Sequence, residues 1–169
     1  MTTPSRLDNQ QMAQRVFQEL RPGSAVALGP GLPGLVAGQA PPGSQILFLS
    51  ESGGLGYQAL AATAGQGQIV VDSGGQGVDL IPGGSMLSTV DVAALIRGGY
   101  AGAVVLQPAQ VSPQGDFSHW TTAATPGLFS PGWAWDLANG PGRVIAIMAH
   151  TSADGRANIV SQCTLPVYG

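Results

Sequence analysis

The sequence contains no lysine, and charged residues of every kind are scarce. Only 9% of its 169 residues are charged, against about a quarter in an ordinary soluble domain, and all six basic residues are arginines. Without lysine, neither Schiff-base chemistry nor a P-loop lysine for nucleotide phosphates is available. The net charge of −3 also provides no basic surface for nucleic acid. We therefore exclude these chemistries and expect no nucleic-acid partner.

Cysteine and histidine are almost absent as well. The single cysteine, Cys163, cannot form an internal disulfide, which favours a reducing, cytoplasmic compartment. Its place in the apolar run 159–167 is typical of a core residue rather than a nucleophile. His119 and His150 are the only histidines, and with one cysteine they have no metal-ligand spacing. We therefore expect no metal site, and no serine in a nucleophile-elbow pattern suggests an acid–base triad.

Long hydrophobic runs are missing too. No apolar run reaches the roughly 18 residues that a membrane helix needs, and no basic-then-apolar leader is present, so we predict neither membrane insertion nor secretion. The scarcity of charged residues, which usually cover a protein surface, needs an explanation. A partner that covers part of it is one interpretation, because the centre of a subunit interface is depleted in charge. A compositional bias of the genome is the other.

Glycine, at 26 residues, and proline, at 13, separate a series of short apolar runs, which indicates tight turns rather than disorder. Two segments, 8–20 and 88–97, predict helices that begin after the N-cap residues Asp8 and Ser88. The apolar runs predict buried strands at 25–28, 46–49, 69–71, 78–81, 104–106 and 144–148.

This alternation predicts a single α/β domain over residues 1–169. Continuously apolar strands interleaved with helices favour an open, mainly parallel sheet with helices on both faces. The hairpin-type turn Asp154-Gly155 predicts an antiparallel edge at the C-terminal end of that sheet. The segment 121–132 is expected to be one long loop, a kind of segment that often carries function.

A carboxylate follows the second predicted strand where its apolar run ends. Glu51 lies between Ser50 and Ser52 and precedes Gly53 and Gly54. Ligands of open parallel sheets bind beyond the carboxyl ends of the strands. Glycines there let a substrate approach the backbone and let main-chain N–H groups point at an anion. The residues alone leave two interpretations, a catalytic carboxylate or a surface glutamate in a loop or helix cap.

A second glycine loop follows the first predicted strand. Gly29, Gly31 and Gly34 match the dinucleotide-binding fingerprint, and Glu51 follows the next strand at nearly the expected offset. The fingerprint also requires a long helix between the two strands, and only the segment 33–40 is available for one. A dinucleotide-binding domain is therefore the weaker alternative.

Five short motifs occur in order along the chain. They are Gly29-Pro30-Gly31-Leu32-Pro33-Gly34, Ser50-Glu51-Ser52-Gly53-Gly54, Ile96-Arg97-Gly98-Gly99, Gln110-Val111-Ser112 with Gly115-Asp116, and His150-Thr151 through Cys163-Thr164-Leu165-Pro166. In this order they resemble the β subunit of class I coenzyme A transferases of the 3-oxoacid type. The resemblance extends from about residue 8 to the end of the chain.

The resemblance implies a covalent role for Glu51. In the family, the glutamate of this signature attacks an acyl-CoA, forms a mixed anhydride and then a glutamyl-CoA thioester, and passes the CoA to a second carboxylic acid. This route splits one difficult exchange into easier steps and needs no cofactor beyond the CoA of the substrate. By resemblance, the oxyanion and CoA-binding residues are Gly29, Gly31, Gly53, Gly54, Gly132 and Trp133.

The flanks of this site depart from the family pattern. Ser52, Gln107, His119 and Trp133 stand where the family has asparagine, glycine, asparagine and glycine. These departures leave three outcomes open: a transferase for an unusual acyl group, an acyl-CoA hydrolase or decarboxylase, or a catalytically silent partner subunit. The resemblance also implies a homologous α subunit that completes the active site in a heterodimer or heterotetramer, so we expect the chain alone to be inactive.

Overall fold

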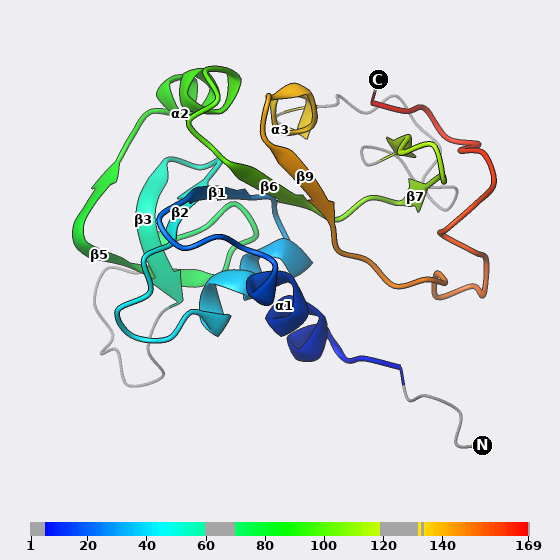
Figure 1. Ribbon diagram of the computed structural model, residues 1–169, viewed down its shortest axis with the longest axis horizontal. Helices are drawn as coiled ribbons and strands as arrows, with labels where there is room; N and C mark the ends of the chain where they lie inside the picture. Colours follow the sequence, from blue (N-terminus) through cyan, green and yellow to red (C-terminus); the bar gives the residue numbers. More distant parts are fainter. Residues whose placement is uncertain (1–5, 60–69, 119–131, 133, 169) are drawn as a thin grey trace.

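The structure is a computed structural model of the chain, and it describes residues 6–59, 70–118, 132 and 134–168. Its centre is an open seven-stranded sheet with the strand order β4-β5-β3-β2-β1-β6-β9 (Figure 1). Four neighbouring strands run parallel: β2 (Leu47–Ser50), β1 (Ala25–Leu28), β6 (Ala103–Leu106) and β9 (Arg143–Ala146). The antiparallel strands are β3 (Gly54–Ala59), β5 (Gly77–Met86) and β4 (Val70–Val71).

Helices cover both faces of the sheet, which confirms that part of the predicted fold class. One face carries α1 (Asn9–Gln18) and the 3₁₀ helix η1 (Leu32–Gln39), and the other carries α2 (Thr89–Arg97) and α3 (Ala134–Asn139), as Figure 1 shows. The strand β1 divides the core, because successive side chains of a strand point to opposite faces. Val26 and Leu28 pack in the layer with α1 and η1, whereas Ala27 packs in the layer with α2 and α3.

Both helices predicted from capping residues form, and each begins at its predicted cap. The Asp8 side chain accepts a hydrogen bond from Gln11 N at 2.8 Å, and the Gln11 side chain accepts one from Asp8 N at 2.9 Å, a complete capping box. The Ser88 hydroxyl accepts one from Asp91 N at 3.2 Å at the start of α2. Local sequence therefore determines where these helices begin.

The sheet is mixed rather than mainly parallel, and its antiparallel edge is not C-terminal. Three strand pairings are parallel and three are antiparallel, with β3, β5 and β4 forming the antiparallel side. The C-terminal strand β9 is parallel to β6. The turn at Asp154-Gly155 does form, but it makes a single bridge, Thr151 to Ala157.

The segment after that turn leaves the main sheet and pairs elsewhere. A second, two-stranded sheet is formed by β7 (Gln110–Val111) and β8 (Phe117–Ser118). Ile159 forms a bridge with Val111, and the Gln110 side chain accepts hydrogen bonds from Thr164 N and Leu165 N. The C-terminal residues therefore attach to β7 instead of extending the edge of the large sheet.

The strand β3 is absent from the sequence predictions, which placed Gly53 and Gly54 in one loop. Gly54 is the first residue of β3 and pairs with Met86 of β5. A register shift between Leu55 and Tyr57 falls at Gly56, whose φ of +69° is accessible mainly to glycine. Past this bulge the strand runs over η1, where a Cβ on Gly38 would lie 3.6 Å from that of Ala59.

Candidate active site

Glu51 lies in a turn at the carboxyl end of β2. Leu28 of β1 pairs with Ser50 of β2, so the glycine loop after β1 and the loop after β2 leave the same edge of the sheet, as predicted. Gly53 N donates to Ser50 O at 3.0 Å, which closes a four-residue turn with Glu51 in its second position. The hydroxyls of Ser50 and Ser52 are 2.8 Å apart within this turn.

Gly53 fixes this turn against the segment that precedes α2. Its φ of +117° is a conformation that residues with a side chain rarely adopt. A Cβ at this position would overlap the carbonyl oxygen of Leu87. In the other direction, Leu87 N donates to Gly53 O at 2.9 Å. Glycine is therefore required here for both backbone conformation and space.

A third segment reaches the site from the antiparallel side of the sheet. It is the turn between β4 and β5, residues 72–76, which we call the 72–76 turn. Ser73 and Asp72 of this turn lie close enough to Glu51 to affect the pKa of its carboxyl group. Gln76 Nε2 donates to Gly31 O at 3.2 Å, so the same turn also contacts the glycine loop. No prediction from the sequence assigned a role to this turn, although its Asp-x-Gly pattern is typical of a tight turn.

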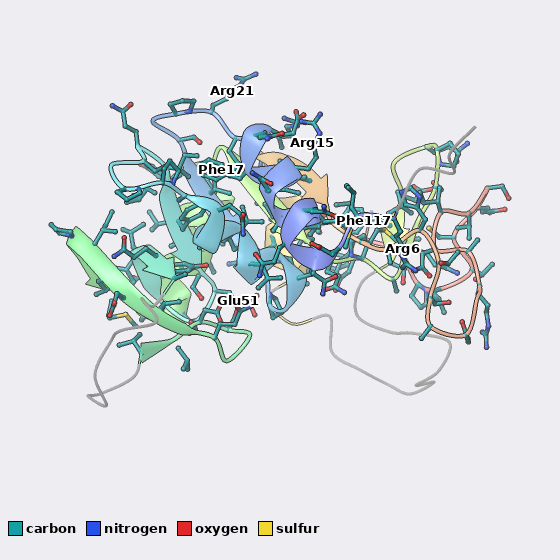
Figure 2. The ribbon with its side chains drawn as sticks, turned by 90° about the horizontal axis from the view of Figure 1, so that it is seen from below. Arg6, Arg15, Phe17, Arg21, Glu51 and Phe117 are labelled. Carbon is teal, nitrogen blue, oxygen red and sulfur yellow. The ribbon has the colours of Figure 1, made fainter. Side chains whose placement is uncertain are left out.

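The environment of Glu51 differs from that of a fully solvated surface glutamate. Its side chain is half-buried, and burial raises the pKa of Glu51 from its ordinary value. The Ser73 hydroxyl lowers this pKa, and the nearby charge of Asp72 raises it. Figure 2 shows Glu51 well apart from Arg6, Arg15 and Arg21. Glu51 is therefore a partly desolvated carboxylate without an arginine beside it.

Tyr57 adds a buried hydroxyl to this neighbourhood. Its side chain is only 2% exposed, and among the described residues its hydroxyl has no hydrogen-bond partner. Burial raises the pKa of Tyr57, and the charges of Asp72 and Glu51 raise it further. A buried hydroxyl without a partner costs about 1–3 kcal/mol. The region behind Glu51 is thus polar and incompletely satisfied, as is common at functional sites.

Hydrogen bonds to β6 and to Gln107, the residue that follows β6, hold the glycine loop after β1 in place. Gly29 N donates to Val105 O at 3.0 Å, and Leu32 N donates to the Gln107 side chain at 3.1 Å. Gly31 has a φ of +80°, and within the described part of the chain its N–H makes no hydrogen bond. The N–H groups of Gly29 and Gly53 are engaged within the chain, contrary to the expectation of free donors. Of these three glycines, Gly31 is therefore the one whose backbone N–H is available to donate to a substrate.

A cavity of about 320 Å³ opens beside the glycine loop. Its lining residues are Asn9, Met12, Gly31, Leu32, Leu35, Gln76, Gln107 and Ala149. A second cavity of about 530 Å³ shares Met12 and Ala149 with the first and includes Arg6, Arg15 and His150. The two cavities are adjacent, the smaller one is lined by Gly31, and Glu51 lines neither of them.

Several of the other residues singled out from the sequence fall outside the described residues. Gly132 precedes α3 with a φ of +56°, while Trp133, His119 and most of the predicted loop 121–132 lie outside the described residues. Cys163 is half-buried, and burial raises the pKa of its thiol, the reverse of what an activated nucleophile needs. The described residues contain no group of three metal-ligating side chains. They also include no helix long and apolar enough to cross a membrane.

The raised pKa of Glu51 predicts that its charge costs stability. The folded chain then binds this proton more tightly than the unfolded chain, whose pKa is near 4.5. The stability gained from binding this proton is therefore present below that pH and is lost as the pH rises through the pKa of Glu51 in the folded chain. We expect Glu51→Gln to raise the melting temperature of the chain at pH 7, and this gain to vanish near pH 4.

Glu19 provides the matched control for this measurement. It is the other glutamate of the sequence and forms exposed ion pairs with Arg15 and Arg143. Exposed pairs contribute little, so Glu19→Gln should change the melting temperature only slightly at either pH. A melting temperature of Glu51→Gln that equals the wild-type value at pH 7 would mean that Glu51 is fully solvated.

The comparisons with known proteins cover almost the whole chain. The sequence profile of the family described as Coenzyme A transferase matches residues 9–169. The chain is 40% identical over 160 residues to the β chain of the acetate CoA-transferase of Escherichia coli K12, covering 94% of this chain and 71% of that protein.

Solved structures share the fold at lower identity. A crystal structure of an acyl-CoA transferase apoenzyme from Escherichia coli O157:H7 superposes with a TM-score of 0.68 at 16% identity. The superposition covers 99% of this chain and 32% of that longer chain. The decarboxylase AibA/AibB superposes with a TM-score of 0.57 at 16% identity, over 93% of this chain and 65% of that one. The fold is therefore common to proteins with different reactions.

Proposed function

Because the chain belongs to the coenzyme A transferase family and is of its β-subunit type, we propose that it carries the nucleophile of an enzyme that moves CoA between an acyl-CoA and a carboxylic acid. The nucleophile is Glu51, and the intermediate is a glutamyl-CoA thioester. The observation that carries this proposal is the half-buried carboxylate of Glu51, held in a glycine turn where two parallel strands end.

The exchange balances without a redox step or an added cofactor. A carboxylate oxygen of Glu51 attacks the thioester carbonyl, the carbon–sulfur bond breaks, and CoA leaves as a thiolate. The thiolate then attacks the glutamyl carbonyl of the mixed anhydride and releases the acyl group as a carboxylate. A second carboxylate reverses these steps, so that the CoA thiolate is recaptured in each half and one carboxylate is released for each one that enters. Covalent catalysis of this type keeps the free energy of the thioester on the enzyme.

Partial burial supports both halves of this route. A desolvated carboxylate is more basic than one in water, and a basic carboxylate attacks more readily. Excluding water also protects the anhydride and the thioester from hydrolysis. The tetrahedral intermediates carry negative charge and need fixed donors nearby. The N–H of Gly31 is one candidate, and Gly132 and Trp133 remain predicted donors from the family resemblance.

A homologous α subunit forms the second part of the proposal. All six arginines lie within the described residues, and none is among the charged groups that shift the pKa of Glu51. Among the described residues, no arginine therefore acts on the Glu51 carboxylate, near which the thiolate and the oxyanions develop. We expect the α subunit to supply such cations at the interface between the two subunits. The low charge of the sequence also fits a surface that a partner covers.

We expect co-expression with such an α subunit to give a stable heteromer with CoA-transferase activity. Acetyl-CoA and acetoacetyl-CoA, each tested with a set of short carboxylic acids, should give ping-pong kinetics. Acetyl-CoA alone should leave a CoA adduct on this chain, detected by intact-mass analysis and mapped to the peptide that contains Glu51. Borohydride should reduce the adduct and hydroxylamine should cleave it.

The alternative functions give different results in the same assay. A hydrolase or decarboxylase consumes acyl-CoA without an acceptor acid and accumulates free CoA or a shortened acyl-CoA. A silent partner subunit forms the heteromer but no adduct. A monomer that neither binds the α subunit nor forms the adduct would refute the proposal.

A further inference from the structure

The larger of the two cavities lies between α1 and the segment that follows β9, and the covalent route gives it no role. Its lining residues come from 6–16 and 146–151, and we call it the α1–β9 cavity. Its volume of about 530 Å³ is in the range of sites that bind small molecules. It is therefore large enough to hold a ligand of its own.

Both walls of this cavity are fixed by the fold. On one side, Val16 of α1 is buried in the core of the molecule. On the other side, Ile147 N donates to Leu106 O at 2.9 Å, and Asn158 Nδ2 donates to Ala149 O at 2.9 Å. Asn158 N also donates to His150 O at 2.8 Å. The cavity is thus preformed, so a ligand loses little free energy in ordering it.

The charge of the lining is the reverse of the charge of the chain. The chain has nine acidic and six basic residues. Arg6, Arg15 and His150 line the α1–β9 cavity, whereas no aspartate or glutamate is among the described residues that line either cavity. Arg6 forms no ion pair within the described part of the chain. The cavity therefore attracts anions.

Arg15 remains available to an anion although it pairs with Glu19. The two side chains are 2.8 Å apart and exposed, and Glu19 also lies 3.6 Å from Arg143. An exposed pair of this kind contributes only about 0–1 kcal/mol, so a ligand can compete for Arg15. Figure 2 shows Arg6 and Arg15 well apart from Glu51, which places this positive region away from the proposed nucleophile.

The floor of the cavity is apolar. Val16 and Ile147 are buried, and Met12 and Met148 are half-buried. Methionine adapts to irregular shapes, and its sulfur makes favourable contacts with aromatic rings. A ligand that fits both the floor and the charged rim has an apolar or aromatic body and an anionic group.

We propose that the α1–β9 cavity binds an organic phosphate, with its ring on the methionine floor and its phosphate between Arg6 and Arg15. A phosphate ester carries a charge of about −1.5 to −2 at pH 7, which matches two guanidinium groups better than the single charge of a carboxylate. Arginine also binds phosphate oxygens with two parallel hydrogen bonds. Adenine nucleotides combine a ring and a phosphate in this way.

Two sources can supply this chemistry, the nucleotide end of CoA or a free nucleotide. The smaller cavity shares Met12 and Ala149 with the α1–β9 cavity and extends to Gly31. The end of β9 lies three strand spacings, about 14 Å, from the end of β2, where Glu51 is located. A ligand with a long arm, such as CoA, spans this edge of the sheet, whereas a free nucleotide occupies the α1–β9 cavity alone.

Isothermal titration calorimetry on the full chain tests the proposal. The probes are adenosine 3′,5′-bisphosphate, adenosine monophosphate, CoA, inorganic phosphate and hexanoate. The nucleotides should bind more tightly than inorganic phosphate, which lacks the ring, and than hexanoate, which lacks the second charge. Arg6→Gln and Arg15→Gln should each weaken nucleotide binding roughly tenfold, the loss expected for one hydrogen bond between charged groups.

Two variants are matched controls. Arg21→Gln removes an exposed arginine that lines neither cavity, so it makes the same change in net charge and should leave the affinity unchanged. Glu19→Gln breaks the ion pair of Arg15 but keeps the arginine, so the affinity should stay the same or rise. Melting temperatures of the four variants check that each of them is folded.

The affinities of CoA and adenosine monophosphate identify the source. CoA bound at least tenfold more tightly supports the nucleotide end of CoA, and a smaller difference supports a free nucleotide. The proposal is overturned if no nucleotide binds at millimolar concentration, if hexanoate or inorganic phosphate binds as tightly, or if Arg21→Gln weakens binding as much as the other two. The site does not depend on Glu51 as nucleophile, since the same titration in Glu51→Gln should give the wild-type affinity whether or not the heteromer forms a CoA adduct.

Discussion

Glu51→Gln is expected to reduce turnover of the heteromer to background and to abolish the CoA adduct, while Glu51→Asp lowers kcat/KM on the order of a hundredfold. Glutamine keeps the size of the side chain and removes the charge that attacks the thioester. Aspartate keeps the charge and withdraws it by one methylene, a displacement that misaligns attack. Steady-state kinetics and intact-mass analysis with acetyl-CoA measure both effects.

Glu19→Gln is the control for this series, since it removes the other glutamate of the chain from an exposed ion pair on α1. It should retain the wild-type rate and adduct. A Glu51→Gln heteromer that turns over acyl-CoA at the full rate contradicts the covalent route. The hydrolase and decarboxylase interpretations would then remain, with Glu51 at most positioning the substrate.

Glu51→Gln is expected to lower activity but to raise the stability of the chain at neutral pH. The charge of Glu51 is partly buried beside Asp72, which costs folding free energy at neutral pH. Removing that charge relieves the cost and removes the nucleophile. Such opposition is typical of functional sites, where an arrangement that favours the reaction is not the most stable one.

Gly53→Ala is expected to destabilise the chain by about 3 kcal/mol or more, the largest effect of any single methyl group in the site. Two costs add at this position. The φ of +117° is unfavourable for any residue with a Cβ, and that Cβ would overlap the carbonyl oxygen of Leu87. Urea denaturation followed by circular dichroism measures the free energy of unfolding.

Gly43→Ala separates the two costs. Gly43 has a φ of +80°, and a Cβ there meets no atom within 4 Å. Only the conformational penalty applies, and it should amount to about 1–2 kcal/mol. Equal destabilisation in the two variants would mean that the Ser50–Gly53 turn shifts away from Leu87 easily, so that the contact does not hold Glu51 in place.

The sequence by itself determined the local features of this protein. Asp8 and Ser88 predicted the starts of two helices, because a capping side chain acts within three residues of its own position. The aliphatic runs at 25–28 and 104–106 predicted two central strands, because buried parallel strands are apolar on both faces. Glu51 was singled out because a carboxylate between serines and glycines, directly after such a run, has no role in the core.

Only the tertiary structure decided which side of the sheet is antiparallel and which residues meet Glu51. The C-terminal segment pairs with Val111 and Gln110 instead of the sheet edge, a choice between two long-range partners that a local turn pattern cannot make. Asp72 and Ser73, in the turn between β4 and β5, affect the pKa of Glu51 because folding brings their turn near the end of β2. Their short polar turn looks like any other in the sequence, since its position beside Glu51 arises only when the chain folds.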